Sequence, residues 1–175
     1  MNIPSSRNPA VATSLNPFVA TSLNPRVATS LNPRVATSNN PFVATSLNPR
    51  VATSHNPGVA TSLNYRVATS LNPDVSTSLH PRVSTSKNPN IASNIDGLFL
   101  WNLELSPVGF TVQANDRVRL IFTPDADFSG VLIEVRDDFW NEYDLDNEWN
   151  GYWVHARDNV WLRYSLESEW VGFTT

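Results

Sequence analysis

The chain has 175 residues, of which 12 are Lys or Arg, 16 are Asp or Glu and none is Cys. The lack of cysteine excludes a disulfide framework and a thiolate metal site. No stretch reaches the roughly 18 consecutive apolar residues of a membrane-spanning helix, so we expect no membrane span. Residues 1–95 hold seven basic side chains and one acidic one, whereas residues 96–175 hold five basic and fifteen acidic ones. The basic residues lack interleaved aromatic residues, so we expect no nucleic-acid partner.

One octapeptide, Asn-Pro-x-Val-Ala-Thr-Ser-Leu, is repeated eleven times over residues 8–95 without insertion or deletion. So strict a period indicates a structure built by stacking small units rather than by folding a globule. Residues 1–7 precede the repeats as an N-terminal leader. All six Trp residues lie in residues 96–175, which predicts an aromatic-rich domain there. We therefore divide the chain into a leader, an eleven-octad shaft and an acidic head.

Each octad predicts a turn followed by a short strand. Proline excludes a continuous helix because it has no amide hydrogen and pushes the preceding Asn out of the helical region. Asn-Pro-x-Val suits a type I turn closed by the Asn side chain as an Asx turn, and Val-Ala-Thr-Ser-Leu then reads as a strand. Position four is always Val or Ile, which predicts the inward residue, while variable position three faces solvent. The predicted repeat core is Val11, Val19, Val27, Val35, Val43, Val51, Val59, Val67, Val75, Val83 and Ile91.

Three physical states remain open for the octads: a single-chain β-solenoid, a homotrimeric fibre and a disordered stalk. Departures from the consensus sort by odd and even octads, which favours a solenoid with two octads in each coil. The period, the repeated Val and the order of shaft then head resemble the octapeptide-repeat needles and repeat-built shafts of phage tail fibres. The resemblance implies self-association as a trimer or filament and a place outside a cell or on a virion surface.

The C-terminal part predicts about seven short strands of alternating apolar residues, separated by turn signals such as Ser-Pro and Asn-Gly. The strands are expected at residues 98–105, 108–113, 118–122, 131–135, 152–155, 160–164 and 170–173. That number is enough for a small antiparallel β-sandwich or barrel. The fold class is therefore all-β, with a repeat solenoid or fibrous shaft followed by a β head.

Residues 137–149 are the best candidate for a ligand site, because six carboxylates are interleaved with large aromatic side chains. Aromatic rings can stack on the apolar face of a sugar while carboxylates accept its hydroxyl hydrogens. The candidate ligand-binding residues are Trp140, Tyr143, Asp144, Asp146, Glu148 and Trp149. Oxygen atoms of Asp144, Asp146 and Glu148 also suit a Ca²⁺ ion. The alternative is a solvated acidic hairpin whose aromatic residues point into the core.

We expect a structural or adhesive fibre, or a surface-display protein, whose head binds a glycan, a protein receptor or a neighbouring subunit. Recurrent Thr and Ser leave an ice-binding solenoid as an alternative, and the opposite charges of the two parts leave a self-assembling filament subunit. Asp138 and Glu148 could form a glycosidase pair. No catalytic nucleophile motif accompanies the three histidines, so we expect no enzyme, and the sequence assigns no catalytic residue.

Overall fold

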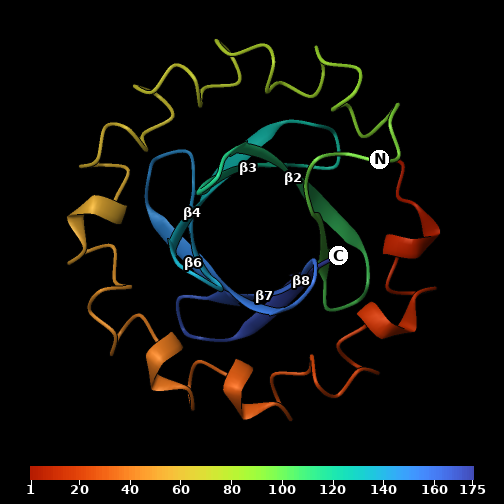
Figure 1. The fold of residues 1–175 in the computed structure, drawn as a ribbon, viewed down its shortest axis with the longest axis vertical. Coiled ribbons are helices and arrows are strands. Elements are labelled where there is room, and N and C mark those ends of the chain that lie inside the picture. Colours follow the sequence, from red (N-terminus) through yellow and green to blue (C-terminus); the bar gives the residue numbers. More distant parts are fainter.

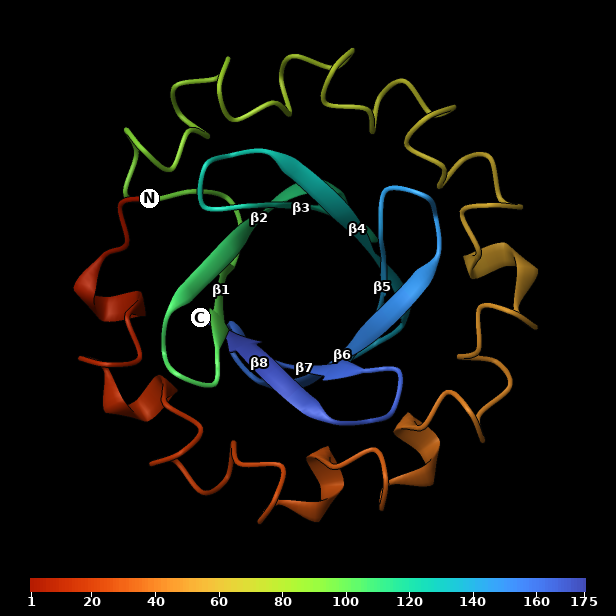
Figure 2. The same ribbon diagram turned by 180° about the vertical axis from the view of Figure 1, so that it is seen from behind.

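The computed structural model describes residues 1–175, apart from the side chain of Thr53, and arranges them as two concentric layers (Figure 1). The inner layer is a closed barrel of eight antiparallel strands in chain order. The strands are β1 (Phe99–Asn102), β2 (Pro107–Asn115), β3 (Val118–Phe122), β4 (Phe128–Arg136), β5 (Phe139–Tyr143), β6 (Trp149–Arg157), β7 (Val160–Ser165) and β8 (Trp170–Thr174). The outer layer is a ring of octads that surrounds the barrel (Figure 2). The predicted all-β class is confirmed, and the head is a barrel rather than a sandwich.

The barrel closes because β1 pairs with β2 on one side and with β8 on the other. Closure leaves no free strand edge, which is the feature of open sheets that invites association with another chain. Strand β3 lies where the sequence predicts it. Strand β5 lies inside the acidic segment that the sequence predicts as a ligand site, where charged residues at several neighbouring positions obscure the alternation of a strand.

The octads form a ring of turns, and the predicted solenoid or fibrous shaft is not what the structure shows. In the first octad the amides of Val11 and Ala12 donate to the carbonyl oxygen of Asn8, at 3.0 and 2.8 Å, and the amide of Leu15 donates to Ala12 at 2.9 Å. Several octads tighten into a 3-10 turn, as does the leader; these turns are η1 (Ser5–Arg7), η2 (Thr13–Leu15), η3 (Thr29–Leu31), η4 (Thr37–Asn39) and η5 (Thr53–His55). Local bonds and proline leave few backbone groups for a strand ladder.

The Asx turn is confirmed at the start of ten octads; in the octad that begins with His80, Nδ1 of the histidine accepts the amide hydrogen of Arg82 at 3.2 Å. The side-chain oxygen of Asn24, for example, accepts the amide hydrogen of Arg26 at 2.9 Å, and Asn48 does the same for Arg50. Position three of the octad is exposed, as predicted. A turn at the start of every octad therefore reverses the chain, even where Tyr65 replaces proline or His80 replaces asparagine, which is why the repeat can curve around the barrel.

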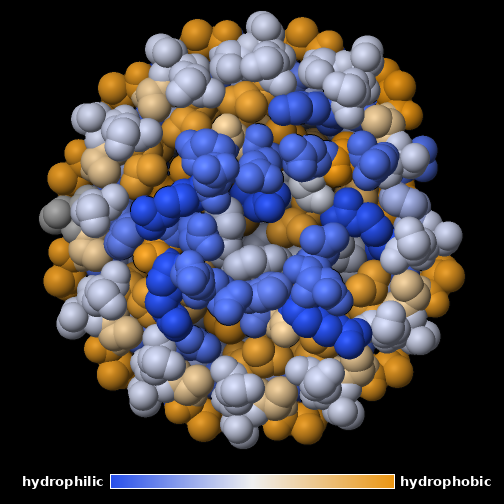
Figure 3. Space-filling model, in the orientation of Figure 1, coloured by the Kyte–Doolittle hydropathy of each residue, from blue (hydrophilic) through white to orange (hydrophobic). Residues whose placement is uncertain are grey.

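The prediction that position four forms the repeat core is wrong. The side chains of Val11, Val19, Val27, Val35, Val43, Val51, Val59, Val67, Val75, Val83 and Ile91 lie on the outside of the ring and are 58–65% exposed. They contribute to the apolar rim that Figure 3 shows around a hydrophilic centre. The strand alternation that would have turned them inward does not exist, because the segment after Asn-Pro is a pair of turns.

Leucine at position eight, not valine, joins the ring to the barrel. Leu23, Leu47, Leu71 and Ile95 occupy this position in every third octad and are only 1–4% exposed. Three of them, Leu47, Leu71 and Ile95, belong to the hydrophobic cluster that also contains the outward-facing aromatic residues of the barrel. Burial of such a side chain stabilises a fold by about 1.5–3 kcal/mol. The ring and the barrel wall therefore share one core.

The barrel also has an internal period, which the sequence-based prediction missed. Leu105, Ala126, Asn147 and Ser168 recur at a constant spacing, and each has a positive φ between 60° and 68° in the turn of a hairpin. A glycine with the same spacing follows each turn, and a Cβ on Gly151 would lie only 2.7 Å from the carbonyl oxygen of Tyr164. Identical turns and identical close approaches show that the barrel consists of four equivalent segments, which we call hairpin units.

The two periods are in register around the axis. Arg157 donates to the carbonyl oxygen of Ser14, and Arg136, at the equivalent place in the preceding hairpin unit, donates to that of Ser38 at 3.0 Å. The ring thus advances by three octads for each hairpin unit, and the two layers run in opposite senses. Where the ring closes, the amide of Asn2 donates to the carbonyl oxygen of Pro89 at 2.7 Å.

The barrel interior holds a smaller cluster of Leu98, Leu100, Ile121, Leu132, Trp140 and Trp153. Beside it the carboxylate of Glu142 accepts two hydrogen bonds from the Arg163 guanidinium, at 2.7 and 2.6 Å, and a third from the Trp153 indole. Burial alone would lower the pKa of Arg163, but the charge and hydrogen bonds of Glu142 raise it. In the part of the chain described here, no helix is long and apolar enough to cross a membrane.

Candidate ligand clefts

Two clefts lie between the ring and the barrel at equivalent positions of the repeat. The first, which we call the Trp149 cleft, has a volume of about 370 Å³ and is lined by Pro49, Arg50, Asn56, Tyr143, Asn147, Glu148, Trp149 and Leu166. The second, the Trp170 cleft, has a volume of about 340 Å³ and is lined by Pro25, Arg26, Asn32, Arg34, Tyr164, Ser168, Glu169 and Trp170. Each ring residue of one cleft is separated from its equivalent in the other cleft by three octads of sequence. Each barrel residue is separated from its equivalent by one hairpin unit, as the register of the two layers requires.

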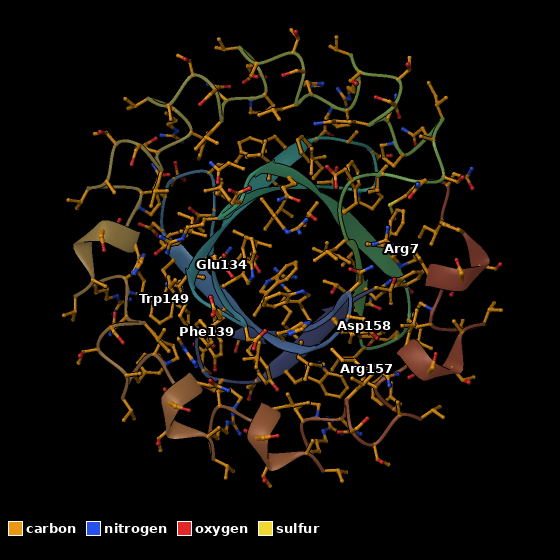
Figure 4. All side chains as sticks on the ribbon, in the orientation of Figure 1. Arg7, Glu134, Phe139, Trp149, Arg157 and Asp158 are labelled. Atoms are coloured by element: carbon orange, nitrogen blue, oxygen red, sulfur yellow. The ribbon has the colours of Figure 1, made fainter. Side chains whose placement is uncertain are left out.

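A tryptophan at the start of a strand lines each cleft; Trp149 is 8% exposed and Trp170 is half-buried. Trp149 begins β6, and its indole N–H donates to the carbonyl oxygen of Gly151 at 2.8 Å; Trp170 begins β8 and bonds Gly172 in the same way. Trp149 lies in the layer between barrel and ring (Figure 4). The ring of Phe42 lies 5.9 Å from Trp149, and that of Phe18 lies 5.1 Å from Trp170. Each indole is therefore held in place by both layers.

A tyrosine hydroxyl ties each cleft to the ring. Tyr143 donates to the carbonyl oxygen of His55 at 2.7 Å, and Tyr164 donates to that of Leu31 at 2.7 Å. Burial raises the pKa of both phenols well above the ordinary value. Both hydroxyls therefore stay protonated at neutral pH and remain donors, which fixes the distance between the octads and the hairpin beneath them.

The hairpin turn places one carboxylate at the mouth of each cleft. In the β5–β6 turn, Oδ1 of Asp144 accepts the amide hydrogens of Asp146 and Glu148 at 2.9 Å each, and Asn147 has a φ of 63°. In the β7–β8 turn the Oγ of Ser165 accepts the amide hydrogen of Glu169 at 3.3 Å. The capped turn orders the backbone and leaves the glutamate side chain exposed.

Two charged side chains of the Trp149 cleft are available for a ligand. Within the described residues, neither the Arg50 guanidinium nor the Glu148 carboxylate has a hydrogen-bonding or ionic partner. The side-chain amide of Asn56 donates to the carbonyl oxygen of Pro49 at 3.3 Å, and its oxygen accepts from Gly58 at 2.8 Å. The cleft thus combines an aromatic wall, a cationic donor and an anionic acceptor.

The structure brings together half of the residues that the sequence predicts for a ligand site. Tyr143, Glu148 and Trp149 line the Trp149 cleft. Trp140 lies instead in the barrel interior, edge-on to Trp161 with ring centroids 5.7 Å apart. The side chains of Asp144 and Asp146 make other contacts, the first as the turn cap and the second in an ion pair of 3.2 Å with Arg66.

Two other predicted groupings do not form. Among the residues with described side chains, no three His, Cys, Asp or Glu residues gather closely enough to hold a metal ion; the calcium site suggested by Asp144, Asp146 and Glu148 gains no support. Asp138 lies at the opposite end of β5 from Glu148, where it bonds Nδ1 of His155 at 2.7 Å. The two carboxylates of the suggested glycosidase pair therefore face different ends of the barrel.

The ring side of both clefts and the whole Trp170 cleft were missed by sequence-based prediction. A signal for the second was present, because Tyr164, Glu169 and Trp170 follow Tyr143, Glu148 and Trp149 at the spacing of one hairpin unit. The ring residues Arg26 and Arg50 carried no such signal, since position three varies freely along the octads. Comparisons with protein families, with curated proteins and with solved structures find no match.

Proposed function

We propose that this protein binds saccharides without turning them over, with one site in the Trp149 cleft and one in the Trp170 cleft. The observation that carries the proposal is the recurrence of the same chemistry at two equivalent positions: a tryptophan wall, an arginine from an octad, a glutamate from a hairpin turn and an asparagine beside them. A sugar offers an apolar face and a set of hydroxyl groups, and this set of side chains complements both.

The size of the clefts agrees with a small saccharide unit. Volumes of about 370 and 340 Å³ fall near the lower end of the range for ligand pockets, which is roughly 300–1,000 Å³. Arg50 and Glu148 supply charge-assisted hydrogen bonds, which are stronger than bonds between neutral groups. For a sugar ring stacked near Trp149, we propose that Arg50 bonds a hydroxyl group on one side of the sugar and Glu148 bonds a hydroxyl group on the other side.

Binding rather than hydrolysis is proposed because each cleft has a single carboxylate, Glu148 or Glu169, among its described lining residues. Glycoside hydrolysis commonly requires two carboxyl groups that flank the bond. Two sites on one chain also support the adhesive role expected from the sequence, since a surface that displays many saccharides would engage both sites and gain avidity. An adhesive or surface-display protein is the setting that we propose for this binding.

A glycan array followed by calorimetry on the best ligand tests the proposal. We expect each of the two clefts to contribute one binding site in the intact protein. Binding at the Trp149 cleft should be lost in a double variant, Arg50→Ala with Glu148→Gln, because the variant removes both charged groups proposed to bond the ligand. Both side chains are exposed, so the substitutions should not disturb the core. The matched control is Glu104→Gln, which removes an exposed carboxylate from the β1–β2 turn. The equivalent double variant of the Trp170 cleft is Arg26→Ala with Glu169→Gln. Full binding in both double variants would refute these sites.

A further inference from the structure

The two clefts differ in charge at one ring position. Arg34 lines the Trp170 cleft, and the equivalent residue three octads later, at the Trp149 cleft, is Gly58. The backbone is the same at both places, since the amides of Arg34 and Gly58 each donate to the preceding Asn side chain, at 2.9 and 2.8 Å. The difference therefore lies in the side chain alone.

The extra arginine changes the balance of charge around a ligand. The Trp170 cleft presents Arg26 and Arg34 against Glu169, whereas the Trp149 cleft presents Arg50 against Glu148. The Arg26 guanidinium lies over the Trp170 ring, 5.9 Å from its centroid. One cleft therefore has an excess of one positive charge and the other is balanced.

Arg34 is only loosely held by the protein itself. Its Nη2 lies 3.7 Å from Oε1 of Glu169 and donates to the carbonyl oxygen of Glu167 at 3.1 Å. Both side chains of the ion pair are more than half exposed, and exposed pairs at this distance contribute little free energy. A ligand carboxylate or sulfate that meets both arginines can therefore displace this weak contact.

We propose that the Trp170 cleft selects saccharides that carry an anionic group, a carboxylate or a sulfate, while the Trp149 cleft accepts neutral ones. The inference rests on the proposed saccharide-binding function and specifies its ligands. A planar guanidinium matches the geometry of either oxyanion through two parallel hydrogen bonds. The protein then holds two sites of different specificity built from one repeated frame.

A third hairpin unit supplies a matched control. Arg82 stands six octads after Arg34 and pairs with Asp127 at 2.5 Å. There Asp74 occupies the place of Arg26, and Phe128 occupies the place of Trp170. Arg82 is thus an exposed arginine at the same octad position as Arg34 but beside a different set of side chains.

The test uses the full chain and reciprocal variants, Arg34→Gly and Gly58→Arg, with Arg82→Gly as the control. The probes are array glycans in matched neutral, carboxylated and sulfated forms. We expect Arg34→Gly to lower affinity for the acidic forms by about tenfold. Neutral binding at the Trp149 cleft, which Arg34 does not line, should persist. Gly58→Arg should add a second acidic site, and Arg82→Gly should change neither.

The possible outcomes distinguish failure of the specificity proposal from failure of the saccharide-binding proposal. If glycans bind but Arg34→Gly leaves the ratio of acidic to neutral affinity unchanged, the specificity proposal fails and the saccharide-binding proposal stands. If no glycan binds the intact protein, both fail. The carboxylated and sulfated arms decide between the two anions, because a site for one should rank it above the other in the intact protein and lose that ranking in Arg34→Gly.

Discussion

The hydroxyl of Tyr164 in β7 donates a hydrogen bond to the carbonyl oxygen of Leu31, 133 residues earlier in the chain, at a distance of 2.7 Å. Tyr143 makes the same bond to His55 one hairpin unit away. These contacts show that the octads are not an independent shaft. In these two hairpin units the octads are tied to the hairpin that they cover, and the clefts lie beside these ties.

Removal of one tie should loosen the ring locally. We expect Tyr164→Phe to lower the free energy of unfolding by about 0.5–1.5 kcal/mol, the net contribution of one hydrogen bond. Amide hydrogen exchange should accelerate around Leu31. The control is Tyr152→Phe, which removes a hydrogen bond between two residues of the barrel layer, Tyr152 and Ser168, and should leave exchange at Leu31 unchanged. Equal effects of the two variants on the octads would contradict the tie.

In the octads, truncation of a buried leucine should lower the free energy of unfolding, whereas truncation of an exposed valine should not. We expect Leu47→Ala, at a side chain 1% exposed, to cost about 2–5 kcal/mol, and Val43→Ala, at one 60% exposed, to cost close to nothing. Denaturant unfolding of both variants measures the difference. A larger loss for Val43 would restore the inward valine predicted from the repeat and reject the ring packing.

The ion pair in the barrel interior should behave as a buried pair. Glu142→Gln leaves Arg163 without its counter-charge, so we expect a loss of about 3–5 kcal/mol. Arg163→Gln should cost a similar amount, and the double variant should cost less than the sum of the two. A double-mutant cycle in chemical denaturation gives the coupling. Additive losses would show that the pair contributes nothing beyond its separate side chains.

Acid should weaken the protein through His55. Burial, with a smaller effect of the Arg117 charge, lowers the pKa of His55 below its ordinary 6.5. The unfolded chain therefore binds the proton more readily, so this histidine costs nothing above pH 6.5 and destabilises the fold as the pH falls below that value. We expect His55→Leu, which copies the equivalent Leu31, to reduce the loss of stability between pH 7 and pH 5.

The measurement at high pH serves as the reference for the pH series. At pH 8 the difference between the intact protein and His55→Leu reports packing alone, and only the change in that difference with pH reports the proton. Thermal unfolding at fixed ionic strength measures both. An unchanged slope in the variant would place the acid sensitivity on other groups.

The octad period, the Asx turn and the exposed position three could be predicted from the sequence, because each depends on bonds between residues a few positions apart. Asn and Pro impose the turn wherever they occur. Whether Val or Leu is the buried residue of the octad could not be predicted in this way. Both are apolar, and only the presence of a partner surface selects which of them is buried.

Seven of the eight strands of the barrel were visible as alternating residues, and β5 was not. Tyr143, Glu148 and Trp149 were predicted as part of one site, together with Trp140, Asp144 and Asp146, which do not line the cleft. Arg50 and Asn56 were not predicted, since they lie in the ring, far from the hairpin in the chain. The sequence by itself therefore determined the local turns and strands, whose hydrogen bonds join near neighbours. Only the tertiary structure decided that the octads encircle the barrel, because that arrangement depends on matching three octads of the ring to each hairpin unit and on the apolar outer wall that the leucines cover.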